Sequence, residues 1–155
     1  MSESEIIRVA FICTANAARS QIAEGLTRAW AKENVWVESA GLRPMGLART
    51  AIEVMAEIGI DISHQRSKGL EELSPDQDYV ITVCDNAAEY CGTLPAKREN
   101  LHWPIPDPGG MFDCPGDTRQ LYRQAREMLA TRIRQFLAER NLLRGAVTQQ
   151  NSDSR

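Results

Sequence analysis

The sequence reads IIRVAFICTANAARS at residues 6–20, and this stretch sets the interpretation of the whole chain. Residues 6–12 are apolar except for Arg8, which is typical of a buried strand. Small and polar residues follow, and residues 20–32 then have the spacing of a helix. We therefore expect Cys13 at the carboxyl end of a strand, with the N-terminus of a helix pointing at it.

This placement predicts a chemical role for Cys13. The first N–H groups of a helix are unpaired and carry partial positive charge, so they favour an anion. Positive charge near a cysteine stabilises its thiolate, which is the nucleophilic form. Arg19 can offer a planar guanidinium to a tetrahedral oxyanion, and Ser20 can donate a hydrogen bond to the thiolate. The alternative is a buried strand-end cysteine beside a surface arginine.

The predicted oxyanion-binding loop lies between this cysteine and the helix. Backbone N–H groups and a guanidinium would hold a phosphate-like anion there, with the thiolate aimed at its central atom. We expect Asn16 to fix the shape of the loop through its amide, the alternative being a simple turn preference. The loop residues are Thr14, Ala15, Asn16, Ala17, Ala18, Arg19 and Ser20.

Length and composition narrow the class of protein. The chain has 155 residues, 43% of them apolar and 25% charged, which suits one soluble globular domain. The net charge of −3 argues against a nucleic-acid partner. No apolar stretch approaches the roughly 20 residues of a membrane span, and no signal peptide is evident. We expect a cytoplasmic monomer with a single catalytic domain at 1–145 and a disordered tail at 146–155, with no membrane partner.

Four cysteines stand at positions 13, 84, 91 and 114. Structural disulfides are rare in cytosolic proteins. The chain has two histidines and no C-x-x-C pair, so no metal site is predicted, and no cofactor. By elimination, redox chemistry is the leading interpretation of the cysteines, with core packing as the alternative.

Strand and helix patterns alternate along the chain. We expect strands at 6–12, 35–39, 79–83 and 100–103. We expect helices at 20–32, 51–58 and 118–141, with short helical segments within 60–74 and 85–91. This order predicts an α/β fold, a three-layer, four-stranded parallel sheet with helices on both faces. Ligands bind at the carboxyl ends of such strands, where Cys13, Cys84 and Asp107 would converge.

Helical spacing of apolar residues predicts the buried faces of two helices. In the helix near 51–58 the predicted face consists of Ala51, Ile52, Met55, Ala56 and Ile58. In the last helix it consists of Leu121, Ala125, Met128 or Leu129, Ile133 and Phe136 or Leu137.

Asp107 lies in a loop that prolines and glycines hold to a fixed course. A carboxyl group at this edge of the sheet is a candidate general acid, which would protonate a departing oxygen. The alternative is an aspartate that serves only the Asp-Pro turn.

Cys84 and Cys91 form a second candidate pair. If residues 85–91 are helical, the two Cα atoms lie about 10 Å apart along the helix axis. A disulfide needs about 4.4–6.8 Å, so joining them requires the segment to unwind. The alternative is a strand-end cysteine followed by an incidental thiol.

Several motifs together resemble the low-molecular-weight tyrosine phosphatase superfamily, and within it the thioredoxin-coupled arsenate reductases. They are CTANAARSQIAEG at 13–25, ESAG at 38–41, GIDIS at 59–63, VCD at 83–85, HW at 102–103 and DP at 107–108. The similarity covers most of residues 6–140. The Cys-x5-Arg loop points to the superfamily only, whereas the cysteines at 84 and 91 point to the reductases.

The resemblance implies a relay of three catalytic cysteines. Cys13 would attack arsenate held by Arg19 and the loop, with Asp107 assisting the loss of water. Cys84 would then attack Cys13 and expel arsenite, and Cys91 would attack Cys84. The implied reductant is thioredoxin, although some relatives use glutaredoxin or mycothiol. Phosphate and sulfate are the expected competitors of arsenate.

The chain departs from the family pattern in its loop. Ala15 stands where relatives carry glycine, so Ala15 would be strained if the loop imposed a positive φ there. Some members bind potassium with an asparagine, a glutamate, a serine and an aspartate. Asn16, Glu24 and Ser39 match the first three, but Lys68 stands at the aspartate position. Its ammonium can replace the charge of the cation, so potassium is not predicted.

Two other functions remain open. A low-molecular-weight protein tyrosine phosphatase would need Cys13, Arg19 and Asp107 but neither downstream thiol. Glycines at 109 and 110 follow the Asp-Pro pair, near which phosphatases carry an aromatic residue, and this disfavours aryl phosphates as substrates. A non-catalytic anion-binding or redox-sensing module would keep the disulfide switch without turnover.

Overall fold

The computed structural model describes residues 5–84, 94–108 and 118–145. Within them, four parallel strands form one sheet in the order β2-β1-β3-β4. The strands are β1 (Ile7–Cys13), β2 (Val35–Gly41), β3 (Tyr79–Thr82) and β4 (Glu99–His102). The helices are α1 (Arg19–Trp30), α2 (Arg49–Ala56), α4 (Thr118–Glu139) and the 3-10 helix η1 (Leu70–Glu72). The predicted α/β fold with a four-stranded parallel sheet is confirmed.

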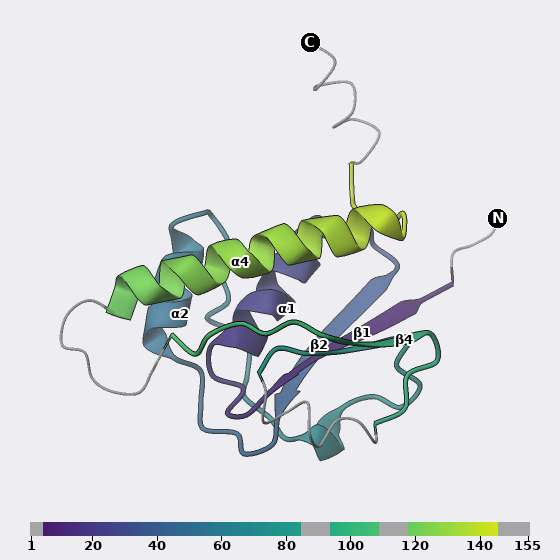
Figure 1. Cartoon of the computed structure of the whole chain (residues 1–155), viewed down its shortest axis with the longest axis horizontal. Helices are drawn as coiled ribbons and strands as arrows, with labels where there is room; N and C mark the ends of the chain where they lie inside the picture. The colour runs from purple at the N-terminus through teal and green to yellow at the C-terminus, as the bar shows by residue number, and fades with distance from the viewer. Residues whose placement is uncertain (1–4, 85–93, 109–117, 146–155) are drawn as a thin grey trace, which may run out of the picture.

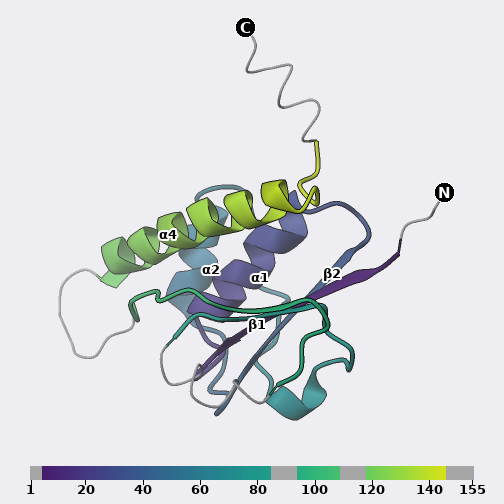
Figure 2. The same ribbon diagram turned by 45° about the vertical axis from the view of Figure 1, so that its right-hand side comes forward.

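The two faces of the sheet are covered by different kinds of structure. The helices α1, α2 and α4 lie together on one side of it, and η1 lies on the other (Figures 1 and 2). In the part of the chain that the structure describes, η1 and its flanking loops therefore form the third layer. The helical segment expected at 85–91 and the tail expected at 146–155 lie outside the described residues. None of the described helices combines the length and hydropathy needed to span a bilayer.

The core is built around β1, which pairs with β2 on one side and β3 on the other. Residues Val9 to Ile12 have no exposed surface, which explains the nearly continuous apolar run of this strand. Aromatic rings connect the sheet to α4. Trp103 lies 5.9 Å from Phe11 and 5.8 Å from Phe136, measured between ring centroids. Burial of these large rings fixes α4 over the sheet.

The buried faces of α2 and α4 agree with the predicted ones at most positions of α4 and at Ala51 and Met55 of α2, and differ at the others. Leu121 and Met128 are 39% and 43% exposed, and Ala56 and Ile58 are also exposed. In α4 the buried residues are Tyr122, Ala125, Arg126, Leu129, Ala130, Ile133, Phe136 and Leu137. In α2 they are Ala51, Val54 and Met55.

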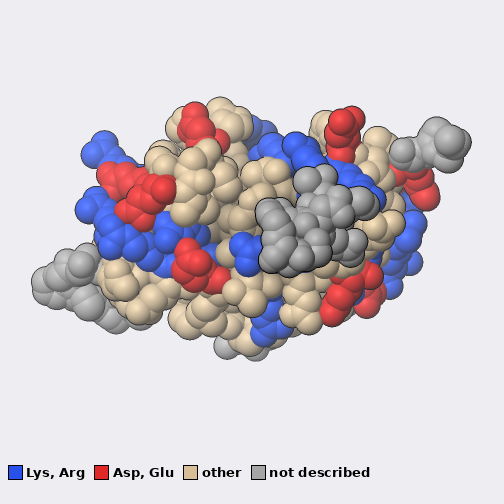
Figure 3. All heavy atoms as spheres, turned by 90° about the horizontal axis from the view of Figure 1, so that it is seen from above, with Lys and Arg blue, Asp and Glu red and all other residues tan. Residues whose placement is uncertain are grey.

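Arg126 is a charged residue on the buried face of α4. Its guanidinium donates to the backbone oxygen of Val54 at 2.8 Å and to Glu57 at 2.9 Å. A buried arginine with such partners occupies a position that hydrophobic periodicity assigns to solvent. Further ion pairs join the two helices on the surface, Arg119 with Glu53 and Arg123 with Glu57. Acidic and basic side chains accordingly lie side by side on this face (Figure 3).

The carboxyl ends of the strands meet at one edge of the sheet. Cys13 is the last residue of β1 and is paired with Gly41 at the end of β2. A Cβ atom on Gly41 would lie 2.7 Å from the backbone nitrogen of Asn16 and 2.8 Å from the oxygen of Thr14. The loop after Cys13 therefore packs directly on Gly41, and only glycine leaves room for it.

Candidate active site

A cavity of about 510 Å³ opens at this edge of the sheet. Its walls are formed by Cys13, Thr14, Ala15, Ala17, Ala18, Arg19, Met45, Cys84, Asp107 and Tyr122. The cavity thus brings together most of the residues that the sequence singled out, from three separate parts of the chain. Cys91 and Cys114 lie outside the described residues.

Cys13 lies on the floor of the cavity with 2% of its surface exposed. Its Sγ is 2.9 Å from the Oγ of Ser20, which lies in the first turn of α1. The N-cap residue, Ala18, provides no side-chain hydrogen bond to the helix. The first N–H groups of α1 are therefore not taken by a capping side chain, and an anion can accept from them.

Asn16 determines the shape of the loop. It is fully buried and has a φ of +50°, a conformation that asparagine tolerates better than most residues. Its Nδ2 donates to Ser20 at 2.8 Å and to Ser39 at 3.0 Å. Its Oδ1 accepts from the backbone N–H of Lys68 at 2.8 Å. The strain expected at Ala15 is therefore absent from that residue, because Asn16 takes the left-handed conformation.

Arg19 links the loop to the segment after β4. Its Nη1 donates to the backbone oxygen of Ile105 at 3.0 Å, and its Nη2 lies 3.7 Å from Oδ2 of Asp107. The Arg19 side chain is 12% exposed, whereas that of Asp107 is 55% exposed. Asp107 can therefore exchange protons with solvent while it faces the anion site, as a general acid must.

Cys84 brings a second thiol to the same cavity. It is 5% exposed, and its Sγ lies 3.2 Å from Oγ1 of Thr14. The two ends of the loop thus touch two different sulfur atoms, because Ser20 contacts Cys13 and Thr14 contacts Cys84. Both of these cysteines are free thiols.

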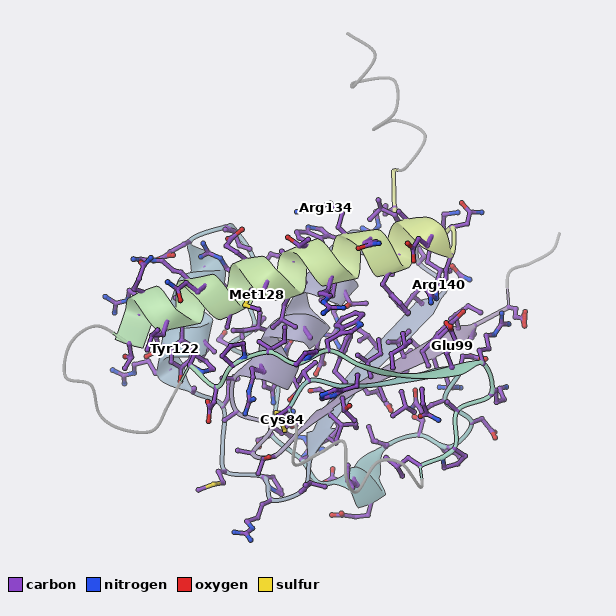
Figure 4. The ribbon with its side chains drawn as sticks, viewed as in Figure 1. Cys84, Glu99, Tyr122, Met128, Arg134 and Arg140 are labelled. Atoms are coloured by element: carbon purple, nitrogen blue, oxygen red, sulfur yellow. The ribbon has the colours of Figure 1, made fainter. Side chains whose placement is uncertain are left out.

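Tyr122 and Met45 also line the cavity, although no sequence motif pointed to either residue. Figure 4 shows Tyr122 near the beginning of α4 and Cys84 at the edge of the sheet. Burial of the Tyr122 phenol, together with the nearby carboxylate of Asp107, raises its pKa. The phenol therefore stays protonated and can donate a hydrogen bond into the cavity. The helical spacing of Tyr122 with Ala125 and Leu129 is the signal that could have found it.

Beneath the floor, the positive charge next to Glu24 comes from an unexpected residue. Lys68 was considered as a possible source of this charge, and its backbone N–H donates to Asn16. The guanidinium of Arg28 instead lies 2.5 Å from Oε2 of Glu24. Ser39 donates to the other carboxylate oxygen at 2.6 Å. Among the described residues, no cluster of three His, Cys, Asp or Glu side chains is placed to hold a metal ion.

Comparison with known proteins identifies the fold family. Residues 8–146 match the family model of the low molecular weight phosphotyrosine protein phosphatases. The chain belongs to this family. Within the family, it is 36% identical to the arsenate reductase of Halalkalibacterium halodurans over 127 residues, which is 81% of this chain and 91% of the relative.

Two solved structures in the comparison are also arsenate reductases. One is described as an arsenate reductase in the phosphate binding state, with a TM-score of 0.69 and 30% identity over 86% of this chain and 98% of that chain. The other is the thioredoxin-dependent arsenate reductase of Corynebacterium glutamicum, with a TM-score of 0.65 and 29% identity. That alignment covers 89% of this chain and 63% of the other. The resemblance inferred from the sequence motifs is confirmed.

Proposed function

We propose that this chain is a thioredoxin-dependent arsenate reductase that acts as a cytoplasmic monomer. The observation that carries the proposal is the meeting of two thiols at one oxyanion loop, where Thr14 lies 3.2 Å from Cys84 and Ser20 lies 2.9 Å from Cys13. Hydrolysis of a phosphate ester needs only one of these thiols. Transfer of two electrons to arsenic needs both, because each thiol supplies one sulfur of the disulfide that forms.

The first step is attack on arsenate by the Cys13 thiolate. Backbone N–H groups of residues 14–18 and the guanidinium of Arg19 hold the oxyanion in place. A sulfur–arsenic bond forms, an arsenic–oxygen bond breaks, and Asp107 protonates the oxygen that leaves as water. Phosphate and sulfate have the same tetrahedral shape and compete for the loop.

The second step uses Cys84. Its thiolate attacks Sγ of Cys13, and the electron pair of the sulfur–arsenic bond moves onto arsenic. Arsenic(V) becomes arsenic(III) and leaves as arsenite, while a disulfide joins Cys13 and Cys84. The hydroxyl of Thr14 is placed to stabilise the attacking thiolate, since it lies 3.2 Å from Cys84 Sγ.

The third step regenerates Cys13. Cys91 attacks Cys84, so that Cys13 leaves as a thiolate and a disulfide joins Cys84 and Cys91. The dithiol of thioredoxin then reduces that disulfide and is itself oxidised. The disulfide between Cys84 and Cys91 must be accessible to thioredoxin for this reduction. The relay requires no cofactor.

The test is arsenate-dependent oxidation of NADPH in the presence of thioredoxin and thioredoxin reductase. Replacement of Cys13, Cys84 or Cys91 by serine should each abolish multiple turnover. The matched control is Cys114→Ser, which removes the remaining cysteine and should leave the rate unchanged. Full multiple turnover by the Cys84 or Cys91 variant would overturn the relay.

A tyrosine phosphatase is the second candidate function, and the aromatic wall that Tyr122 adds to the cavity favours it. This reaction uses Cys13, Arg19 and Asp107 alone. Robust hydrolysis of an aryl phosphate by a double Cys84→Ser, Cys91→Ser variant, at a rate comparable to arsenate reduction by the wild type, would support the phosphatase. Absence of turnover in both assays would support a non-catalytic redox-sensing module instead.

A further inference from the structure

Arg28 lies on α1 outside the cavity, and no step of the proposed relay uses it. Its side chain is 46% exposed. Its guanidinium nevertheless ends two separate chains of hydrogen bonds, and both chains lead to Asn16 under the floor of the cavity. The two chains run through different side chains, which lie on α1, on β2 and in the loop after α2.

The first chain passes through Glu24. Nη2 of Arg28 donates to Oε2 of Glu24 at 2.5 Å, and Ser39 donates to Oε1 at 2.6 Å. Asn16 Nδ2 in turn donates to the Ser39 oxygen at 3.0 Å. A carboxylate only accepts hydrogen bonds, so the ionised Glu24 sets the direction of every bond in this chain.

The second chain passes through two glutamines. Nη1 of Arg28 donates to Oε1 of Gln65 at 2.9 Å, and Nε2 of Gln65 donates to Oε1 of Gln21 at 2.8 Å. Nε2 of Gln21 then donates to Oδ1 of Asn16 at 3.1 Å. A guanidinium only donates, so Arg28 orients the Gln65 amide together with the backbone oxygen of Gln21, which accepts from Nε2 of Gln65 at 3.0 Å. Nε2 of Gln21 also donates to the backbone oxygens of Asn16 and Arg66.

The two chains meet at Asn16 and continue to the nucleophile. Because Oδ1 of Asn16 accepts from the second chain and from the backbone N–H of Lys68, its Nδ2 is turned toward Ser39 and Ser20. The oxygen of Ser20 accepts from Asn16 at 2.8 Å, which leaves the hydroxyl proton of Ser20 for the sulfur of Cys13 at 2.9 Å. A proton donor facing this sulfur stabilises its thiolate form.

We propose that Arg28 is a positioning residue for Cys13, acting through Glu24 and Gln65 to hold the donor of Ser20 toward the sulfur. The inference takes from the proposed function only that Cys13 is the nucleophile. An ion pair between two exposed side chains contributes little. The Glu24 side chain, however, is only 7% exposed, so water screens this ion pair less than it would a pair on the surface.

Other charged or titratable groups also face Cys13 across the cavity. They are Arg19 on α1, Cys84 after β3, Asp107 after β4 and Tyr122 on α4. A substitution at Arg28 leaves all of them in place. If variants at position 28 change the pH dependence of Cys13 reactivity, the change is therefore due to the two hydrogen-bond chains and not to the groups on the cavity wall.

The test is the rate of Cys13 alkylation by iodoacetamide as a function of pH, followed peptide by peptide with mass spectrometry. In Arg28→Gln, we expect alkylation of Cys13 at pH 7 to slow by about three- to tenfold, with its midpoint moved to higher pH by about 0.5–1 unit. Arg28→Lys keeps the charge but cannot bridge both partners, so an intermediate rate is expected.

Arg119→Gln is the matched control, because Arg119 is 49% exposed and also lies 2.5 Å from a glutamate oxygen, on Glu53. In this variant, the rate of Cys13 alkylation should depend on pH as it does in the wild type. A second control combines Arg28→Gln with Glu24→Gln. If Arg28 acts largely through Glu24, adding Arg28→Gln to Glu24→Gln should change little. The rate of Cys13 alkylation in the double variant should then be within about twofold of the rate in Glu24→Gln alone.

The inference is overturned if Arg28→Gln and Arg119→Gln give the same Cys13 profile, whatever their melting temperatures. If Arg28→Gln fails to fold, Arg28→Lys decides in the same way, since an unchanged profile there also overturns it. The assay needs neither arsenate nor thioredoxin. A shifted profile therefore supports the inference even if arsenate reduction is not found.

Discussion

The floor of the cavity comes from one continuous stretch, residues 13–20, whereas its wall is assembled from Cys84, Asp107 and Tyr122 on three other segments. On the floor, Asn16 and Ser20 are fully buried, and their polar side-chain atoms are hydrogen bonded. On the wall, the carboxyl group of Asp107 is 55% exposed.

The difference separates two requirements of the chemistry. An oxyanion is bound by donors that are already in place, so the floor is rigid and its hydrogen bonds are satisfied before the ligand arrives. The reaction that follows depends on which side chains the wall presents. The floor would serve a phosphatase equally well, and Cys84 on the wall distinguishes the proposed reductase.

Gly41→Ala should give the largest effect, because it damages the floor. Its Cβ would lie under 3 Å from backbone atoms of Thr14, Ala15 and Asn16, so the loop must shift. We expect a loss of about a hundredfold in kcat/KM for arsenate and about 1–3 kcal/mol in the free energy of unfolding.

The matched control for this prediction is Gly69→Ala. A Cβ there would meet only the flexible side chain of Glu71 among its nearest atoms. Its kcat/KM should stay within about twofold of the wild type. Equal losses in the two variants would show that the floor does not depend on its packing against Gly41.

Thr14→Val should affect the junction of floor and wall. The variant removes the hydroxyl group next to Cys84 and keeps the shape of the side chain. We expect release of arsenite in a single turnover to slow by about tenfold, because the Cys84 thiolate loses a donor. Alkylation of Cys13 should be unchanged. Thr131→Val, on the exposed side of α4, is the control.

Tyr122→Phe should have a smaller effect, confined to the wall. Because burial raises the pKa of Tyr122, the phenol is protonated across the neutral range and can donate a hydrogen bond to a bound oxyanion. We expect the KM for arsenate to rise about two- to fivefold, with the shape of the pH profile unchanged below pH 9. A new break in the profile near neutral pH would contradict this.

Glu57→Gln should give the smallest effect, on stability alone. Hydrogen bonds from Arg123, and then Arg126, lower the pKa of Glu57 from 4.5 to about 2. A lowered carboxyl pKa stabilises the folded state above the ordinary pKa, and this contribution is lost as the pH falls from about 4.5 through about 2. The difference in Tm from the wild type should therefore be largest near pH 7 and shrink below about pH 4.5.

Glu57, which follows α2, is paired with Arg123 and Arg126 of α4, so its loss should weaken the contact between the two helices and leave the floor intact. Alkylation of Cys13 in Glu57→Gln should proceed at the wild-type rate. A slower rate would mean that the reactivity of Cys13 on the floor depends on how α4 packs. The floor and the wall could then not be treated as independent.

Local sequence patterns determined the order of strands and helices and the position of Cys13 at the end of β1. The same patterns indicated Arg19 and Ser20 as its neighbours. They could do so because strand and helix periodicity, and the contacts of a loop with the helix that follows it, depend on residues close together in the chain.

Only the tertiary structure decided that Arg28, rather than Lys68, pairs with Glu24, and that Tyr122 reaches the cavity while Leu121 faces solvent. Helical spacing allows two neighbouring faces on α4, and the packing of α4 against α1 and α2 selects one of them. The partner of a buried charge likewise depends on which side chains from other elements surround it. Both outcomes depend on contacts between different helices and strands, so the periodicity of a single helix or strand cannot predict them.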